Sequence, residues 1–334
     1  MSASSRRLSS GRASSPCCRT SRATSPDVTA GRPSTEGRWR LLLGTVAFVV
    51  WAPPSLLGLP LVGLLLATRP RTTVEWGTAS GVGVLSAGLL LLPATDLLTG
   101  FVRAYTVLVA AAFVVVTLFA VEKDTLLGRA IRAGLIGGVA AVVLARLQLG
   151  GSAWDALHWE ARRQASAAMR LVVEGWPQAF AMYEPVVRFM SDTVPATLAL
   201  QTLAGLTLAW QWHRRVARNP LGPPPAPFRE FRFGDHWVWA IIAALVGWIT
   251  PAVAGLKLAA LNVLVVLGGL YLVRGIAIVV ACAAAFGIAP AALVIGAVVA
   301  AALAVPLLLL LPGLATLGIT DTWLEFRRRL KAKA

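Results

Sequence analysis

Few side chains in this sequence could do chemistry, and the most informative of them is Arg274. It lies near the middle of the apolar stretch 258–286, which is long enough to cross a bilayer as a helix. A charge at that depth costs at least about 2.5 kcal/mol on insertion scales, so Arg274 needs a compensating partner. Tyr271 lies one turn away on the same helical face, whereas Asn262 lies about 120° around the axis. We hypothesise that Asn262, Tyr271 and Arg274 contact a ligand through an anionic group.

Other partners could satisfy Arg274 without a ligand. A buried acid such as Asp96, or backbone carbonyls, could receive the guanidinium. A helix that ends between residues 271 and 274 would place the charge at the interface instead.

A second group of charged residues follows the last apolar stretch. Asp321 and Glu325 come before the basic run of Arg327, Arg328 and Arg329. Basic residues beside a span bind anionic head groups at the cytoplasmic face. We expect these five residues to anchor the last helix there or to dock a partner.

No motif in the chain indicates catalysis. The sequence has no paired carboxylates, nucleophile elbow, phosphate loop or zinc spacing. Cys17 and Cys18 adjoin in the N-terminal tail, Cys282 lies in an apolar stretch, and the three histidines are scattered. We expect no enzyme activity, no metal site and no cofactor.

The composition predicts an integral membrane protein. Hydrophobic residues make up 57% of the 334 positions and charged residues 14%, which leaves too little polar surface to cover a soluble globule. The net charge of +16 lies in the termini and loops rather than in the apolar stretches. We therefore expect contact with a lipid bilayer and no nucleic-acid binding.

Recurring uncharged stretches predict an all-α fold, a polytopic transmembrane helical bundle of about eight spans. The stretches cover residues 41–68, 77–93, 104–121, 194–212, 237–256 and 275–320. Trp76, Trp212 and Trp237 stand at their ends, where indole rings settle at the head-group level. A shorter apolar run lies between Arg132 and Arg146, whose side chains can extend to the interface, so 130–147 is a further plausible span.

Composition divides the chain into five regions. Residues 1–40 form a Ser- and Arg-rich tail that we expect to be disordered, and 321–334 form a basic tail. Residues 41–147 and 193–320 form two membrane halves of about four spans each, and 148–192 form a polar segment between them.

Two regions depart from plain spans. Pro53 and Pro54 are expected to break the first span into two short helices. In the polar segment, apolar residues recur at helical spacing from Trp154 to Val172. This pattern predicts an amphipathic helix that lies on the membrane surface or caps the bundle, with a gate over a substrate path as the alternative.

Two topologies are possible, and they differ in which side of the membrane the loops face. The loop 214–235 holds five arginines, so the positive-inside rule favours the cytoplasm for it and for the C-terminal tail. Eight plain crossings from a cytoplasmic N-terminus place this loop outside, whereas hairpins at the first and last apolar regions place both basic segments inside. The lengths of the stretches favour eight crossings.

Five segments of the C-terminal half carry a family resemblance. They are Val-Pro-Ala-Thr-Leu at 194–198, Trp-His-Arg-Arg at 212–215, Phe-Arg-Glu-Phe-Arg at 228–232, Gly-Leu-Tyr-Leu-Val-Arg-Gly at 269–275 after Asn262, and Gly-Ile-Thr-Asp-Thr-Trp-Leu-Glu-Phe-Arg at 318–327. On these segments the chain resembles the YybS-like family of bacterial multi-pass membrane proteins, in which a glutamine usually stands at the position of Arg274. That family is distantly similar to the substrate-binding components of energy-coupling-factor vitamin transporters. The resemblance implies a helical bundle in the bacterial cytoplasmic (inner) membrane with an extracytoplasmic cavity.

Two functions fit these observations. The leading one is the binding or transport of a small molecule through the helical bundle. The alternative is a non-transporting scaffold or assembly factor whose basic tail and loop recruit a cytoplasmic partner protein or anionic lipid.

Overall fold

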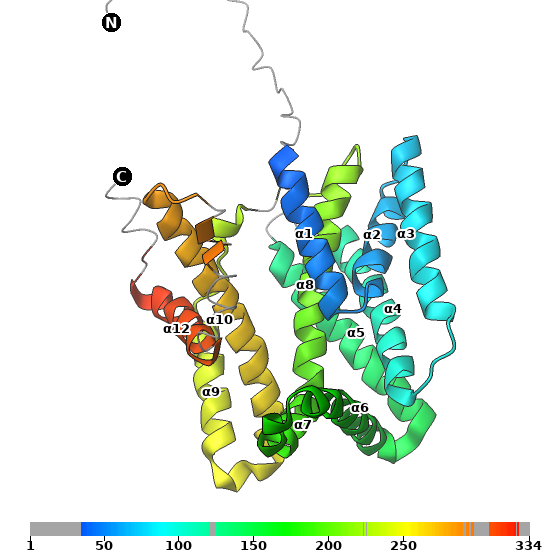
Figure 1. Cartoon of the computed structure of the whole chain (residues 1–334). Coiled ribbons are helices and arrows are strands. Elements are labelled where there is room, and N and C mark those ends of the chain that lie inside the picture. Colours follow the sequence, from blue (N-terminus) through cyan, green and yellow to red (C-terminus); the bar gives the residue numbers. More distant parts are fainter. Residues whose placement is uncertain are drawn as a thin grey trace, which may run out of the picture. The chain divides into compact units, whose positions relative to one another are not determined.

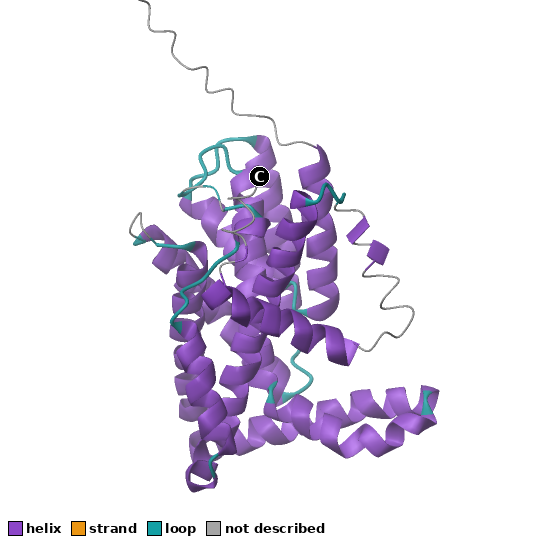
Figure 2. Ribbon diagram, turned by 90° about the vertical axis from the view of Figure 1, so that its left-hand side faces the viewer, coloured by secondary structure: helices purple, strands orange, loops and turns teal. Residues whose placement is uncertain are grey.

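The computed structural model describes residues 35–120, 124–222, 224, 226–289, 292–293, 295–296, 307–324 and 326. Regular structure in these residues is helical, as the sequence predicts, and they contain no strand (Figures 1 and 2). By internal contacts, the described residues from Arg40 onward form one compact unit.

The first apolar stretch forms two helices. α1 (Thr35–Trp51) and α2 (Ser55–Ala67) are separated by a short segment that contains Pro53 and Pro54. Neither proline has an N–H to donate to the carbonyls of α1, so the hydrogen-bond ladder of α1 stops before them.

α1 runs antiparallel to α8 (Val194–Val216). Near the end of α8 the indole of Trp212 donates to Thr45 Oγ1 at 2.8 Å. Near the start of α8 the amide of Gln201 donates to the carbonyl of Trp51 at 2.7 Å. The two bonds fix the register of α1 on α8 along its length.

Three helices follow α2: α3 (Thr73–Leu91), α4 (Leu97–Leu118) and α5 (Leu126–Leu149). Each begins after a residue whose side chain accepts a backbone N–H, namely Thr72, Asp96 and Thr125. Glu75 completes a capping box in α3 and also accepts the N–H of Arg218 at 2.6 Å, just beyond α8. The start of α3 therefore lies beside the end of α8.

Glycines show that α2 turns back after the proline break. A Cβ on Gly58 would contact the side chain of Ser86, and one on Gly83 would contact that of Val62. α2 thus runs antiparallel to α3, and it packs against α4 and α8 as well (Figure 1).

The helices α2, α4, α5 and α8 meet in one hydrophobic core. Its fully buried members include Leu56, Leu64, Phe113 and Leu206. In a bilayer, such packing is stabilised by van der Waals contact between the helices rather than by removal of apolar surface from water.

The polar segment folds into a helical pair that crosses the ends of the longer helices. α6 (Ala153–Gly175) and α7 (Tyr183–Asp192) are joined by the 3₁₀ turn η2 (Pro177–Met182). Both helices run across the bottom of the views in Figures 1 and 2. α6 also packs against α4 and α5. The amphipathic helix predicted for this segment corresponds to α6 in extent.

The C-terminal part is built on the long helix α10 (Lys257–Ala285). α9 (Trp237–Ile249) and α12 (Leu307–Leu324) both pack on it. At the crossing of α10 and α12 the backbones nearly touch, because a Cβ on Gly275 would lie 1.9 Å from the Leu314 carbonyl oxygen. Only glycine allows this approach.

Within the described ranges, four segments are long and apolar enough to cross a membrane: Thr73–Leu91, Leu97–Leu118, Leu126–Gly175, which joins α5, η1 and α6, and Lys257–Ala285. Shorter apolar helices cover Leu41–Trp51, Ser55–Ala67 and Trp237–Ile249. The prediction of an all-helical protein with several membrane-spanning segments is confirmed at this level. The alternative of a helix that ends between residues 271 and 274 is wrong, since α10 runs unbroken through Arg274.

Candidate functional site

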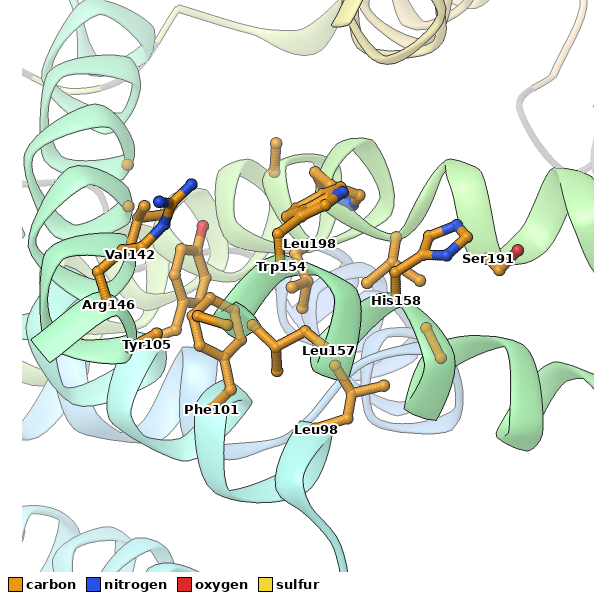
Figure 3. Close-up of a pocket in the computed structure, with 18 residues that line it drawn as sticks. Leu98, Phe101, Tyr105, Val142, Arg146, Trp154, Leu157, His158, Ser191 and Leu198 are labelled. Carbon is orange, nitrogen blue, oxygen red and sulfur yellow. The ribbon is translucent and has the colours of Figure 1, made fainter. Parts of the chain in front are cut away.

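A cavity of about 320 Å³ lies between α4, α5, α6 and the start of α8. Volumes of about 300–1,000 Å³ are typical of small-molecule sites in proteins. Figure 3 shows its lining side chains, with Arg146 and Tyr105 at one end and His158 and Ser191 at the other.

The walls of the cavity are almost entirely apolar. α4 contributes Leu98 and Phe101, α5 contributes Val142, and α8 contributes Leu198. These side chains offer van der Waals contact and no hydrogen bonds.

Two glycines of α5 create the space. A Cβ on Gly134 would meet only a methyl carbon of Thr202, at 3.8 Å, and one on Gly138 only the ring of Tyr105, also at 3.8 Å. Gly137 between them serves a different purpose, because its Cβ would lie 2.7 Å from the Cα of Val109 in α4. Gly137 packs two helices, whereas Gly134 and Gly138 leave a hollow.

The first half of α6 covers the cavity. Its apolar stripe presents Trp154, Leu157 and Ala161 to the lining. The rings of Trp154 and His158 are stacked at 6.4 Å between centroids. The stripe that predicts an amphipathic helix is thus, over this half of α6, the roof of the cavity.

Most polar groups around the cavity are already engaged with one another. The hydroxyl groups of Tyr105 and Thr202 are hydrogen-bonded at 2.8 Å. His158 Nε2 lies 2.9 Å from Asp192 Oδ1, and the Ser191 hydroxyl donates to the Arg188 carbonyl. The guanidinium of Arg146 differs: it is exposed, and no carboxylate within the described ranges pairs with it.

The structure places Arg274 elsewhere, in the C-terminal helices. Its side chain is 0% exposed and lies between two carboxylates, with Nη1 at 2.9 Å from Asp235 Oδ1 and Nη2 at 3.1 Å from Asp321 Oδ2. Its guanidinium also stands over the ring of Phe233, 5.7 Å from the centroid. The predicted buried acid is real, but Asp96 is not that acid: it caps α4 instead.

Tyr271 and Asn262 are likewise held by protein groups. Tyr271 is fully buried and makes an edge contact with Phe233 at 4.8 Å. The Asn262 amide accepts the N–H of Ala196 at 2.9 Å and donates to the carbonyl of Asp192 at 2.8 Å, and so ties α10 to the start of α8. Asn262 and Arg274 are about 18 Å apart along α10 at 1.5 Å per residue.

None of the three predicted ligand contacts lines the cavity. Their role as ligand contacts stays a prediction, but the structure does not gather them into one hollow. Of the predicted docking residues, Asp321 is only 1% exposed and faces Arg274. Glu325, Arg327, Arg328 and Arg329 lie outside the described residues.

The lining residues of the cavity escaped sequence reasoning, although two signals pointed to them. One is the apolar stripe that begins at Trp154, and the other is the four-residue spacing of Gly134 and Gly138, a pattern that is also typical of close helix packing. In the described part of the chain, no three His, Cys, Asp or Glu side chains come together as metal ligands would.

Comparison with known proteins supports the membrane assignment. A family model described as "Predicted membrane protein (DUF2232)" matches residues 43–322, which include the cavity and the Arg274 cluster. No curated protein and no solved structure is significantly similar to the chain. By this match, the chain belongs to the DUF2232 family of predicted membrane proteins.

Proposed function

We propose that this membrane protein binds a small molecule in the cavity between α4, α5, α6 and α8, as the binding step of transport. The observation that carries the proposal is the hollow itself, because protein interiors are close-packed and seldom leave such space unused. A relationship to the YybS-like family, and through it to the substrate-binding components of energy-coupling-factor transporters, remains a prediction drawn from resemblance.

The distribution of charge supports an orientation for the cavity. Arginines gather where α3 and α5 begin and α8 ends: Arg69, Arg71, Arg129, Arg132, Arg214, Arg215 and Arg218. The bond between Glu75 and Arg218 and the stacking of Arg129 on Trp210 hold these helix ends together. By the positive-inside rule this basic end faces the cytoplasm.

The cavity then opens toward the opposite face. The segment 153–192 beside it carries four arginines against five acids, so it lacks a basic excess. In this topology α1 and α2 form a hairpin, and the loop 214–235 lies on the cytoplasmic side with the start of α1. α6 lies at the extracytoplasmic interface of the inner membrane, where it covers the ligand.

A scaffold remains the alternative function. It depends on the basic loop 214–235 and on the basic run 327–329, of which the run lies outside the described residues. No feature of the described helices favours it over binding.

The test is a thermal-shift screen of the purified protein against a metabolite panel. It compares wild type with Gly138→Leu, which fills the cavity, and with Gly81→Leu, where no atom lies within 4 Å of the added Cβ. At least one compound should raise the Tm of wild type and Gly81→Leu but not of Gly138→Leu. The absence of any shift in wild type, or an equal shift in Gly138→Leu, would refute the proposal.

A further inference from the structure

We propose that the ligand is a single-chain amphiphile with an anionic head group, whose hydrocarbon chain fills the cavity and whose head binds Arg146. This inference rests on the proposed function and names its substrate class. It combines three observations: the walls of the cavity are apolar, the guanidinium of Arg146 is not paired with a carboxylate of the described residues, and α6 lies beside the cavity with apolar side chains exposed.

The interior of the cavity suits a hydrocarbon chain. Phe101, Val142, Leu157 and Leu198 can make only apolar contacts. The Tyr105 hydroxyl at the inner wall already has Thr202 as its partner. A polar ring system would lose its hydrogen bonds to water here and gain none, at a cost of about 1–3 kcal/mol for each unsatisfied group.

Arg146 provides the one unengaged charge on the wall. Two arginines of α6 are paired with acids, since Arg162 lies 2.8 Å from Glu184 and Arg163 lies 2.6 Å from Glu160. At the other end of the cavity, His158 is paired with Asp192. The cavity therefore presents a positive group at one end, which complements a carboxylate or phosphate head.

α6 places the cavity beside the lipid leaflet. Beyond the part that roofs the cavity, α6 and η2 expose Leu171, Val172 and Phe180 to the surroundings. Exposed apolar residues on an amphipathic helix insert into the boundary between head groups and acyl chains. Trp154, at the roof, is itself 43% exposed. An amphiphile dissolved in the leaflet can thus enter sideways under α6 with its head at interface level.

The test uses a diazirine-bearing palmitate as photoaffinity probe, with the full chain in nanodiscs of neutral phosphatidylcholine. Peptides from α4, α5, α6 and α8 should carry the label, and Gly138→Leu should lose it while Gly81→Leu keeps it.

Arg146→Gln should weaken palmitate binding about tenfold, because one charge-assisted contact is lost, and should leave hexadecanol binding unchanged.

Competition separates the two sources of the head group. Displacement by free palmitate alone identifies a fatty acid, and displacement by lysophosphatidylglycerol identifies a single-chain phospholipid; either result supports the proposal. Equal binding of palmitate and hexadecanol, or label outside the cavity, overturns it. If the metabolite screen finds a cavity ligand that is not an amphiphile, this inference fails while the proposed function stands.

Discussion

Arg274 illustrates how a buried charge can serve the fold. Removing the guanidinium would take an ion-pair partner from Asp321, which is 1% exposed, whereas Asp235 is half exposed and can turn to water. We predict that Arg274→Leu lowers the free energy of unfolding in detergent by about 3–5 kcal/mol. The double variant Arg274→Leu with Asp321→Leu should recover part of this loss, because the buried carboxylate that Arg274 neutralises is then removed as well. A stable single variant that lost only ligand binding would instead restore Arg274 as a ligand contact.

Asp96 is a second residue whose role is structural. Its carboxylate accepts the N–H of Thr99 at 2.7 Å, and this bond, the largest influence, holds the pKa of Asp96 below its ordinary value. We predict that Asp96→Ala costs about 1 kcal/mol and that Asp96→Asn costs less, since asparagine also caps helices.

The pH dependence has a definite sign. A carboxylate whose pKa is lower in the folded state contributes stability above its unfolded pKa and loses it as the pH falls through the folded pKa. The difference in unfolding free energy between wild type and Asp96→Ala, measured by denaturation in detergent, should therefore be constant near neutral pH and shrink in acid. A difference that grows in acid would contradict this assignment.

Among the contacts between helices, the crossing of α10 and α12 at Gly275 should tolerate an added side chain least. A Cβ on Gly275 would lie 1.9 Å from the carbonyl oxygen of Leu314, and the backbone cannot yield without moving a helix. We predict that Gly275→Ala lowers the Tm measurably. Gly268→Ala on the same helix is the matched control, since no atom lies within 4 Å, and it should be neutral or stabilising by up to about 1 kcal/mol through helix propensity. Equal Tm values for the two variants would mean that the crossing is looser than described.

Helix boundaries and helix faces could be predicted from the sequence, whereas contacts between distant helices could not. The break at Pro53 and Pro54 and the stripe that begins at Trp154 are local patterns, and each matches a helix boundary or a helix face in the structure. The cavity is not local: it needs four helices to pack together with Gly134 and Gly138 turned inward. Asp235 and Asp321 stand 39 and 47 residues from Arg274, so no spacing rule pairs them.

For the whole molecule, the account predicts that the loop after α8 and the turn after α6 face opposite sides of the membrane. In a background with Cys17, Cys18 and Cys282 replaced by Ser, Gln178→Cys should react with a membrane-impermeant maleimide in intact cells. Phe228→Cys should react only after the membrane is opened, because it lies beyond the basic end of α8. Labelling of both in intact cells would contradict the topology.

The proposed function requires that the cavity beneath α6 holds a ligand. Native mass spectrometry of the protein released from membranes of the producing cells can detect that ligand. Wild type and Gly81→Leu should carry a bound mass that Gly138→Leu lacks, because only the last variant fills the hollow beside Tyr105. Identical spectra for all three proteins would contradict the claim.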